Sequence, residues 1–200
     1  MHMRILVTIL CLLPMAWSAT AAAQIVAENP TFKVGDSWSS LITQSGSNTI
    51  SKTIRQNVIE ITAEGDLILS GNNRLDSSLN PGIPGHPEYS RKLYQFPMQV
   101  GSKWSYTNSI NPQWEDTGNF EVVGFEPITV IAGTFNCFHI QGEIKSGGLH
   151  QNHWDRIETW YCPEIKRVAK RIEKITVTES YMPGSYNLKT IELAAFSDAP

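Results

Sequence analysis

Two cysteines, Cys137 and Cys162, constrain the fold of this chain more than any other feature. They stand at the ends of two alternating segments that flank a turn centred on Gly147-Gly148-Leu149-His150, which is typical of a β-hairpin. The register that places the cysteines opposite each other also places Glu143 opposite Arg156. Directly opposed residues of an antiparallel pair have Cα atoms about 4.5 to 5.5 Å apart, within reach of a disulfide. The pattern therefore predicts a hairpin closed by a Cys137–Cys162 disulfide.

The same register divides the hairpin side chains between two faces. Side chains alternate along a strand, so one register fixes both sets. Phe138, Ile140, Ile144, Ile157, Thr159 and Tyr161 share one face, whereas His139 opposite Trp160 and Gln141 opposite Glu158 share the other. The alternative is two reduced, buried thiols. The signal peptide described next favours the disulfide, because disulfides persist outside the cytoplasm.

The first residues have the pattern of a signal peptide. Arg4 supplies the positive charge, Ile5 to Leu13 the apolar run, and Ala21-Ala22-Ala23 the small-residue cleavage site. The run is shorter than the roughly 17 to 25 residues of a membrane span. Cys11 lies inside the apolar run and lacks the small residues that precede a lipidated cysteine, so we do not expect a lipoprotein. We expect residues 1–23 to be removed after Ala23, residues 24–200 to form a single β domain without a membrane span, and a periplasmic or secreted location.

Alternating and β-branched segments predict a mainly β fold. The expected class is a single curved antiparallel sheet or open half-barrel, with few or no helices apart from the signal peptide. Expected strands besides the hairpin are Ser37–Gln44, Thr49–Ile61, Leu67–Ser70 (continuing toward Leu75), Tyr89–Phe96, Val100–Tyr106, Asn119–Gly124 and Tyr186–Phe196. Residues 76–87 and 111–118 are expected to be loops, with a break at Glu126-Pro127. The loop at 76–87 is of a length that fits either a functional loop or a tolerated surface loop. Residues 165–178 fit a helix by spacing and a strand by composition, and we favour a strand paired with the hairpin.

A short sequence occurs twice. Val34-Gly35-Asp36-Ser37-Trp38-Ser39 and Val100-Gly101-Ser102-Lys103-Trp104-Ser105 share the pattern V-G-x-x-W-S. A glycine turn that leads into a strand with an inward aromatic residue would produce it. Both tryptophans are expected to be structural anchors, with a ligand role as the alternative.

Three motifs resemble a family of bacterial exported domains of unknown function. They are the FP-x-x-V-G-x-x-W-x-Y segment within Tyr94–Tyr106, the AGTF of residues 132–135, and the WYxP of residues 160–163. The resemblance covers residues 30–196 and implies the open, curved antiparallel sheet of the outer-membrane lipoprotein carriers; some members are linked by name to type IV pili. It implies no catalytic residue. Glu164-Ile165-Lys166 departs from the glycine-containing turn of many members, which leaves the start of the following strand uncertain.

Several kinds of chemistry are disfavoured. A net charge of −3 disfavours nucleic-acid binding by bulk electrostatics. His153 and Asp155 are expected on the face opposite His139 and Glu158, which argues against a single metal site near His150. Glu115-Asp116 is expected at a solvated loop edge, because adjacent strand residues point oppositely and cannot act as a glycosidase pair. The basic residues Lys166, Arg167, Lys170, Arg171 and Lys174 are expected on a solvated face. We predict no cofactor and no metal.

Two classes of function remain, with an enzyme third. The first is a non-catalytic binding or carrier module for an apolar or lipid-like ligand, with Trp38, Trp104 and Tyr106 as candidate binding residues on a concave face. The second is a protein-interaction or assembly domain of the cell envelope or pilus, with exposed aromatics such as Trp114 and Trp154. The third is a hydrolase, in which His153 would be required for turnover.

Overall fold

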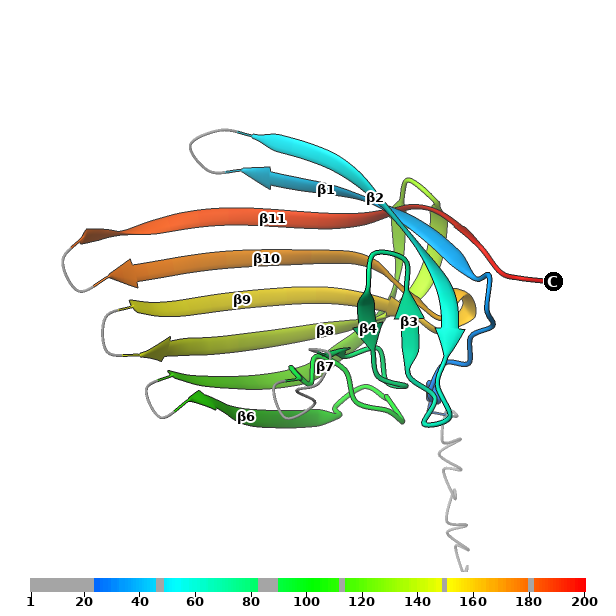
Figure 1. Cartoon of the computed structure of the whole chain (residues 1–200), viewed down its shortest axis with the longest axis horizontal. Helices are drawn as coiled ribbons and strands as arrows, with labels where there is room; N and C mark the ends of the chain where they lie inside the picture. Colours follow the sequence, from blue (N-terminus) through cyan, green and yellow to red (C-terminus); the bar gives the residue numbers. More distant parts are fainter. Residues whose placement is uncertain (1–23, 46–48, 83–89, 112–113, 149–150, 180–181) are drawn as a thin grey trace, which may run out of the picture.

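The structure is a computed structural model that describes residues 24–45, 49–82, 90–111, 114–148, 151–179 and 182–200. Within these ranges eleven strands form one antiparallel sheet that is not closed, in the order β5-β4-β3-β2-β1-β11-β10-β9-β8-β7-β6 (Figure 1). The strands are β1 (Ser37–Ser45), β2 (Ile50–Ile61), β3 (Leu67–Leu69), β4 (Asn73–Leu75), β5 (Pro81–Gly82), β6 (Lys103–Asn111), β7 (Trp114–Val130), β8 (Gly133–Gly148), β9 (Gln151–Cys162), β10 (Arg167–Glu179) and β11 (Met182–Ser197). The predicted fold class, a mainly β protein with an open antiparallel sheet, is confirmed. The described residues contain no helix long and apolar enough to cross a membrane.

The hairpin of β8 and β9 has the predicted register. His139 is paired with Trp160, Gln141 with Glu158, and Glu143 with Arg156. A disulfide joins Cys137 to Cys162. Leu149 and His150, the centre of the predicted turn, lie outside the described residues.

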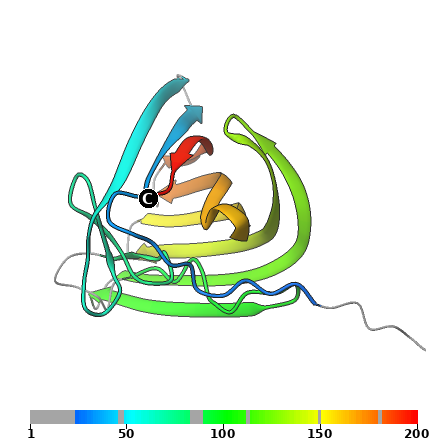
Figure 2. The same cartoon turned by 90° about the vertical axis from the view of Figure 1, so that its right-hand side faces the viewer.

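The sheet is curved, and each of its faces carries a hydrophobic core (Figure 2). Because side chains alternate along β8, Phe138, Ile140 and Ile144 lie in the larger core, while Cys137 lies in the smaller one. The larger core also receives residues from outside the long strands, including Ala27, Leu79, Leu93, Tyr94 and Met98. The smaller core comprises Val130, Cys137, Trp160, Cys162, Ile165, Ala169 and Leu193.

Residues 167–179 form strand β10, as favoured. β10 pairs with β9 on one side and β11 on the other. The pairing with β9 shifts between Val168 and Lys170, and Ala169 between them is fully buried. This bulge places inward residues at a mixed spacing, which explains why the segment also has helical periodicity. The 3₁₀ turn η2 (Pro163–Ile165) and Lys166, with a left-handed φ of 54°, precede the strand.

The two V-G-x-x-W-S sequences have the predicted local structure. Gly35 and Gly101 have φ angles of 100° and 88°, which favour glycine. Each glycine leads into a strand, β1 or β6, whose second residue is the tryptophan. The two tryptophans then have different surroundings, described below.

Residues 90–96 do not form the predicted strand. Their backbone groups form hydrogen bonds with side chains instead. The side-chain amide of Asn80 donates to the carbonyl of Tyr94 (3.1 Å) and accepts from the Tyr94 N–H (2.8 Å). Trp104 Nε1 donates to the carbonyl of Lys92 (2.9 Å). Leu93 and Tyr94 are buried in the larger core. The segment is therefore held by long-range side-chain contacts that local sequence does not encode.

Several predicted boundaries were wrong. Pro81–Gly82, inside the expected loop at 76–87, forms β5, and the last strand begins at Met182. β7 continues through Glu126 and Pro127 without a break. β7 pairs with β6 only from Glu121 to Trp114, so at Pro127 it pairs with β8 alone. Proline has no backbone N–H, and this is tolerated where a strand has no neighbour on one side. Residues 114–118, expected in a loop, begin β7, and residues 67–75 form two strands that pair with each other.

Candidate functional site

Trp104, one of the three candidate binding residues, belongs to the larger core. Its side chain is 7% exposed, and its ring stacks on Phe120 with ring centroids 5.5 Å apart. Its one donor, Nε1, already bonds the carbonyl of Lys92. The residue therefore joins the irregular segment to β6.

Tyr106 is also engaged in the core. Its hydroxyl donates to Asp116 Oδ2 at 3.1 Å, and Asp116 accepts two further bonds from Arg91, each of 3.0 Å. Burial and the Asp116 carboxylate raise the pKa of Tyr106, so it stays a neutral donor. Asp116 is 1% exposed, so the expectation of a solvated loop edge at Glu115-Asp116 was wrong for Asp116, because Arg91 and Tyr106 supply its buried carboxylate with partners.

Trp38 lies at a small pocket that includes neither Trp104 nor Tyr106. The pocket has a volume of about 220 Å³. Its lining residues are Phe32, Trp38, Ser40, Gln56, Leu75, Leu79, Pro81, Leu93, Tyr94, Lys166, Arg167, Val168, Arg171 and Ile191. Trp38 Nε1 donates to Gln56 Oε1 at 3.1 Å, which leaves the ring faces for apolar contact. The structure therefore separates the three candidate residues: Trp38 lines this pocket, whereas Trp104 and Tyr106 are buried in the larger core, and Trp104 also lines a second groove.

Sequence reasoning missed Arg167, which lines the same pocket. It was expected on a solvated face with its basic neighbours, but it is 4% exposed. Arg171, which also lines the pocket, has a side chain only 16% exposed, so the expectation was wrong for both. Arg167 is the first residue of β10 and pairs with Cys162, so the disulfide and η2 position it. Side chains alternate between the two faces of a strand, so a strand at residues 165–178 would place some of these cations on the inner face. The sequence left this segment open between a helix and a strand, and the signal was therefore not used. Lys174 of the same segment is exposed, as expected.

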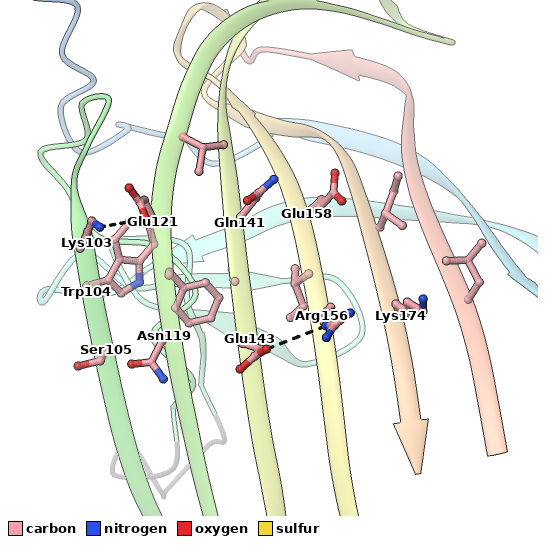
Figure 3. A pocket seen from close by; sticks show the side chains of 16 residues that line it. Lys103, Trp104, Ser105, Asn119, Glu121, Gln141, Glu143, Arg156, Glu158 and Lys174 are labelled. Atoms are coloured by element: carbon pink, nitrogen blue, oxygen red, sulfur yellow. Dashed lines mark ion pairs between the residues drawn. The ribbon is translucent and has the colours of Figure 1, made fainter. Parts of the chain in front are cut away.

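A second, wider groove lies over β6 to β11, and Trp104 is one of the residues that line it (Figure 3). Its volume is about 850 Å³. Its charges largely face one another: Lys103 Nζ lies 3.1 Å from Glu121, and Arg156 Nε lies 4.0 Å from Glu143. These pairs neutralise the groove, so its walls specify no charge for a ligand.

His139 belongs to a polar cluster beside this groove. Its ring stacks on Trp160 with centroids 4.5 Å apart, and its nitrogens lie 3.3 Å from Glu126 and 3.4 Å from Glu158. His139 and Glu158 project from one face and Asp155 from the other, as predicted. In the described part of the chain no group of three His, Cys, Asp or Glu side chains is arranged to hold a metal ion. His150 and the side chain of Trp114 lie outside the described residues.

Asp155 gives a pH-dependent prediction. Burial, and then the nearby carboxylates, raise its pKa above the ordinary 3.8, although Arg91 acts in the opposite direction. A carboxyl whose folded-state pKa is raised destabilises the fold once it ionises, and this cost is absent below its unfolded pKa. We expect Asp155→Asn to be more stable than the unaltered chain at pH 7, with the difference shrinking as the pH falls toward 4. Urea unfolding at both pH values measures it. Glu115→Gln, on the exposed neighbour of Asp116, is the control, and an Asp155→Asn difference that is independent of pH would contradict this explanation.

The described residues thus define an open, eleven-stranded antiparallel sheet with a small apolar pocket at Trp38. No known protein-family model matches the sequence, and no curated protein matches it. A candidate exported protein with a YmcC-like fold from Bacteroides fragilis matches in structure with a TM-score of 0.46 and 10% identity, over 86% of this chain and 100% of that chain. A candidate lipoprotein from Parabacteroides distasonis matches with a TM-score of 0.43 and 11% identity, over 87% and 100%. The hypothetical lipoprotein YmcC from Escherichia coli matches with a TM-score of 0.37 and 14% identity, over 82% and 85%.

Proposed function

We propose that residues 24–200 form a single exported, non-catalytic binding domain that accepts an apolar or lipid-like ligand in the pocket at Trp38. The observation that supports this function is the lining of the pocket, which combines the aromatic rings of Phe32, Trp38 and Tyr94 with a set of aliphatic side chains: Leu75, Leu79, Leu93, Val168 and Ile191. Ligand sites are typically apolar hollows with a few placed polar groups. The volume of about 220 Å³ is below the roughly 300 to 1,000 Å³ of drug-sized sites, so the pocket suits a short chain or one end of a longer one.

A substitution that fills the pocket tests this proposal. Ser40, in β1, lines it, and Ser40→Phe places a ring in the available space. If the ring excludes two methylene groups, about 1.6 kcal/mol of apolar burial is lost, so we expect binding of 1-decanol to weaken about tenfold. Titration calorimetry measures the affinity. Ser105→Phe, the same substitution in the wide groove, is the matched control and should leave the affinity unchanged.

Two results would overturn the proposal: no uptake of 1-decanol by the unaltered chain, or equal weakening by Ser40→Phe and Ser105→Phe. Native mass spectrometry of gently purified protein adds a second readout, because a resident ligand would be carried along.

One observation favours the second class, a protein-interaction domain of the envelope. Trp154 is 39% exposed, and the centroid of its ring lies 4.3 Å from Arg156 Cζ and 5.9 Å from Lys145 Nζ. An exposed aromatic ring beside cations is of the kind found at interfaces. A partner that is lost in Trp154→Ala and retained in Ser40→Phe would favour this class over the binding module. The described residues contain no feature that favours the third alternative, a hydrolase.

A further inference from the structure

The guanidinium of Arg167 is half-satisfied in an enclosed aromatic site. Its Cζ lies 5.8 Å from the ring centroid of Phe32, 5.4 Å from that of Trp38 and 5.2 Å from that of Phe196. One nitrogen, Nη1, donates to the carbonyl of Ile165 (2.7 Å) and to Asp198 Oδ1 (2.9 Å). The other two, Nε and Nη2, are buried and have no hydrogen-bond partner.

These two nitrogens form one edge of the planar group. Nε–H and the neighbouring Nη2–H point the same way, and this fork matches the two oxygens of a carboxylate or phosphate. Buried donors in native proteins nearly always have an acceptor, so an unpaired fork requires an explanation. Its ion pair with Asp198 does not supply one, because that carboxylate is bound at Nη1 and its side chain is 53% exposed.

The charged side chains that line the pocket are all cations. Three cations, Lys166, Arg167 and Arg171, are among the described residues that line it, and no carboxylate is among them. Arg171 is already paired, with its Nε 2.8 Å from Glu173 Oε1. Lys166 is partly exposed, so solvent can reach it, whereas Arg167 is buried and keeps two nitrogens without a partner.

We propose that the ligand is an amphiphile with a small anionic head, a carboxylate or a phosphate monoester, whose oxygens bind the Nε–Nη2 fork of Arg167 while its chain lies against Trp38. This inference rests on the proposed function and adds the charge of the ligand. The fork is closed to water, so the head reaches it when a covering ring moves; Phe32 precedes β1, is only partly buried, and is the covering ring outside the sheet.

The experiment compares probes that share one chain. Decanoate, decyl phosphate and 1-decanol are titrated into the full exported protein by calorimetry, with acetate and inorganic phosphate as head groups without a chain. A hydrogen bond to a charged group favours the anion, so we expect decanoate or decyl phosphate to bind about tenfold or more tightly than 1-decanol. The better of the two anions identifies the head. Neither acetate nor inorganic phosphate should bind comparably.

Two substitutions test the role of Arg167. Arg167→Gln should remove the preference for the anion and leave the affinity for 1-decanol similar. Asp198→Asn, on an exposed side chain, should raise the affinity for the anion several-fold, because it removes the competing charge; this variant carries the test if Arg167→Gln fails to fold. Lys103→Gln, in the wide groove, is the charge control and should change nothing.

The outcomes separate the two proposals. Failure of every chain-bearing probe to bind would overturn the proposed function together with this inference. Equal affinity for decanoate, decyl phosphate and 1-decanol would overturn the inference alone, as would an anion preference that Asp198→Asn leaves unchanged. Binding of acetate or inorganic phosphate as tight as that of the long-chain anions would also overturn it, because the pocket would then contribute nothing.

Discussion

Replacing Cys137 and Cys162 together with alanine is expected to lower the free energy of unfolding by about 3 kcal/mol. The disulfide closes a loop with a sequence separation of 25 residues, and the chain-entropy relation gives about this value for such a loop. Both cysteines are fully buried in the smaller core, so the lost sulfur contacts add to the effect. Urea unfolding of the oxidised chain and the double variant measures the difference.

The reduced, unaltered chain is the control for the disulfide. Reduction keeps both sulfur atoms in the core, so it should reproduce most of the loss, and the double variant should not respond to reductant. Equal stability of the oxidised and reduced chains would contradict the entropic explanation. The same comparison reports on the pocket: Cys162 pairs with Arg167 at the start of β10, so we expect reduction to weaken binding of an anionic amphiphile as well.

The hairpin was predictable because independent constraints agreed on one register. Opposed cysteines, the opposed charges of Glu143 and Arg156, and the alternation of apolar residues all required the same pairing, and a shift by one residue would have violated each of them. The open antiparallel sheet followed from similar alternation in the other strands. The structure of such a segment can be predicted from sequence because its local and long-range preferences agree.

The errors occurred where distant contacts decide the structure. Residues 90–96 resemble a strand, but the side chains of Asn80 and Trp104 bond their backbone. Pro127 resembles a strand break, but it lies where β7 has one neighbour. Trp38 and Trp104 occur in the same short sequence, yet Trp38 lines the small pocket and Trp104 does not, because different segments cover them. The site at Arg167 is formed by aromatic rings from three segments, Phe32, Trp38 and Phe196, and local sequence does not specify that they meet.

The aromatic cluster that buries Trp104 depends on the absence of side chains beneath it. Phe120 stacks with Trp104 and with Tyr106, at centroid distances of 5.5 and 6.3 Å. Phe120 is paired with Gly142 across β7 and β8. A Cβ atom added at Gly142 would overlap the ring of Phe120, which packs directly over that position. Glycine therefore acts at residue 142 by providing space for the ring, and its backbone freedom is not needed there.

Gly142→Ala is accordingly expected to lower the free energy of unfolding by about 1 to 3 kcal/mol, because the ring of Phe120 must shift within a packed core. Gly124→Ala is the matched control: the same substitution in the adjacent strand meets no atom within 4 Å, so it should be neutral or slightly stabilising. Chemical denaturation of both variants measures the difference. Phe120→Leu in the Gly142→Ala background should recover part of the loss, since the smaller side chain leaves room for the added methyl group. Equal effects of Gly142→Ala and Gly124→Ala would show that the ring of Phe120 does not occupy the space above Gly142.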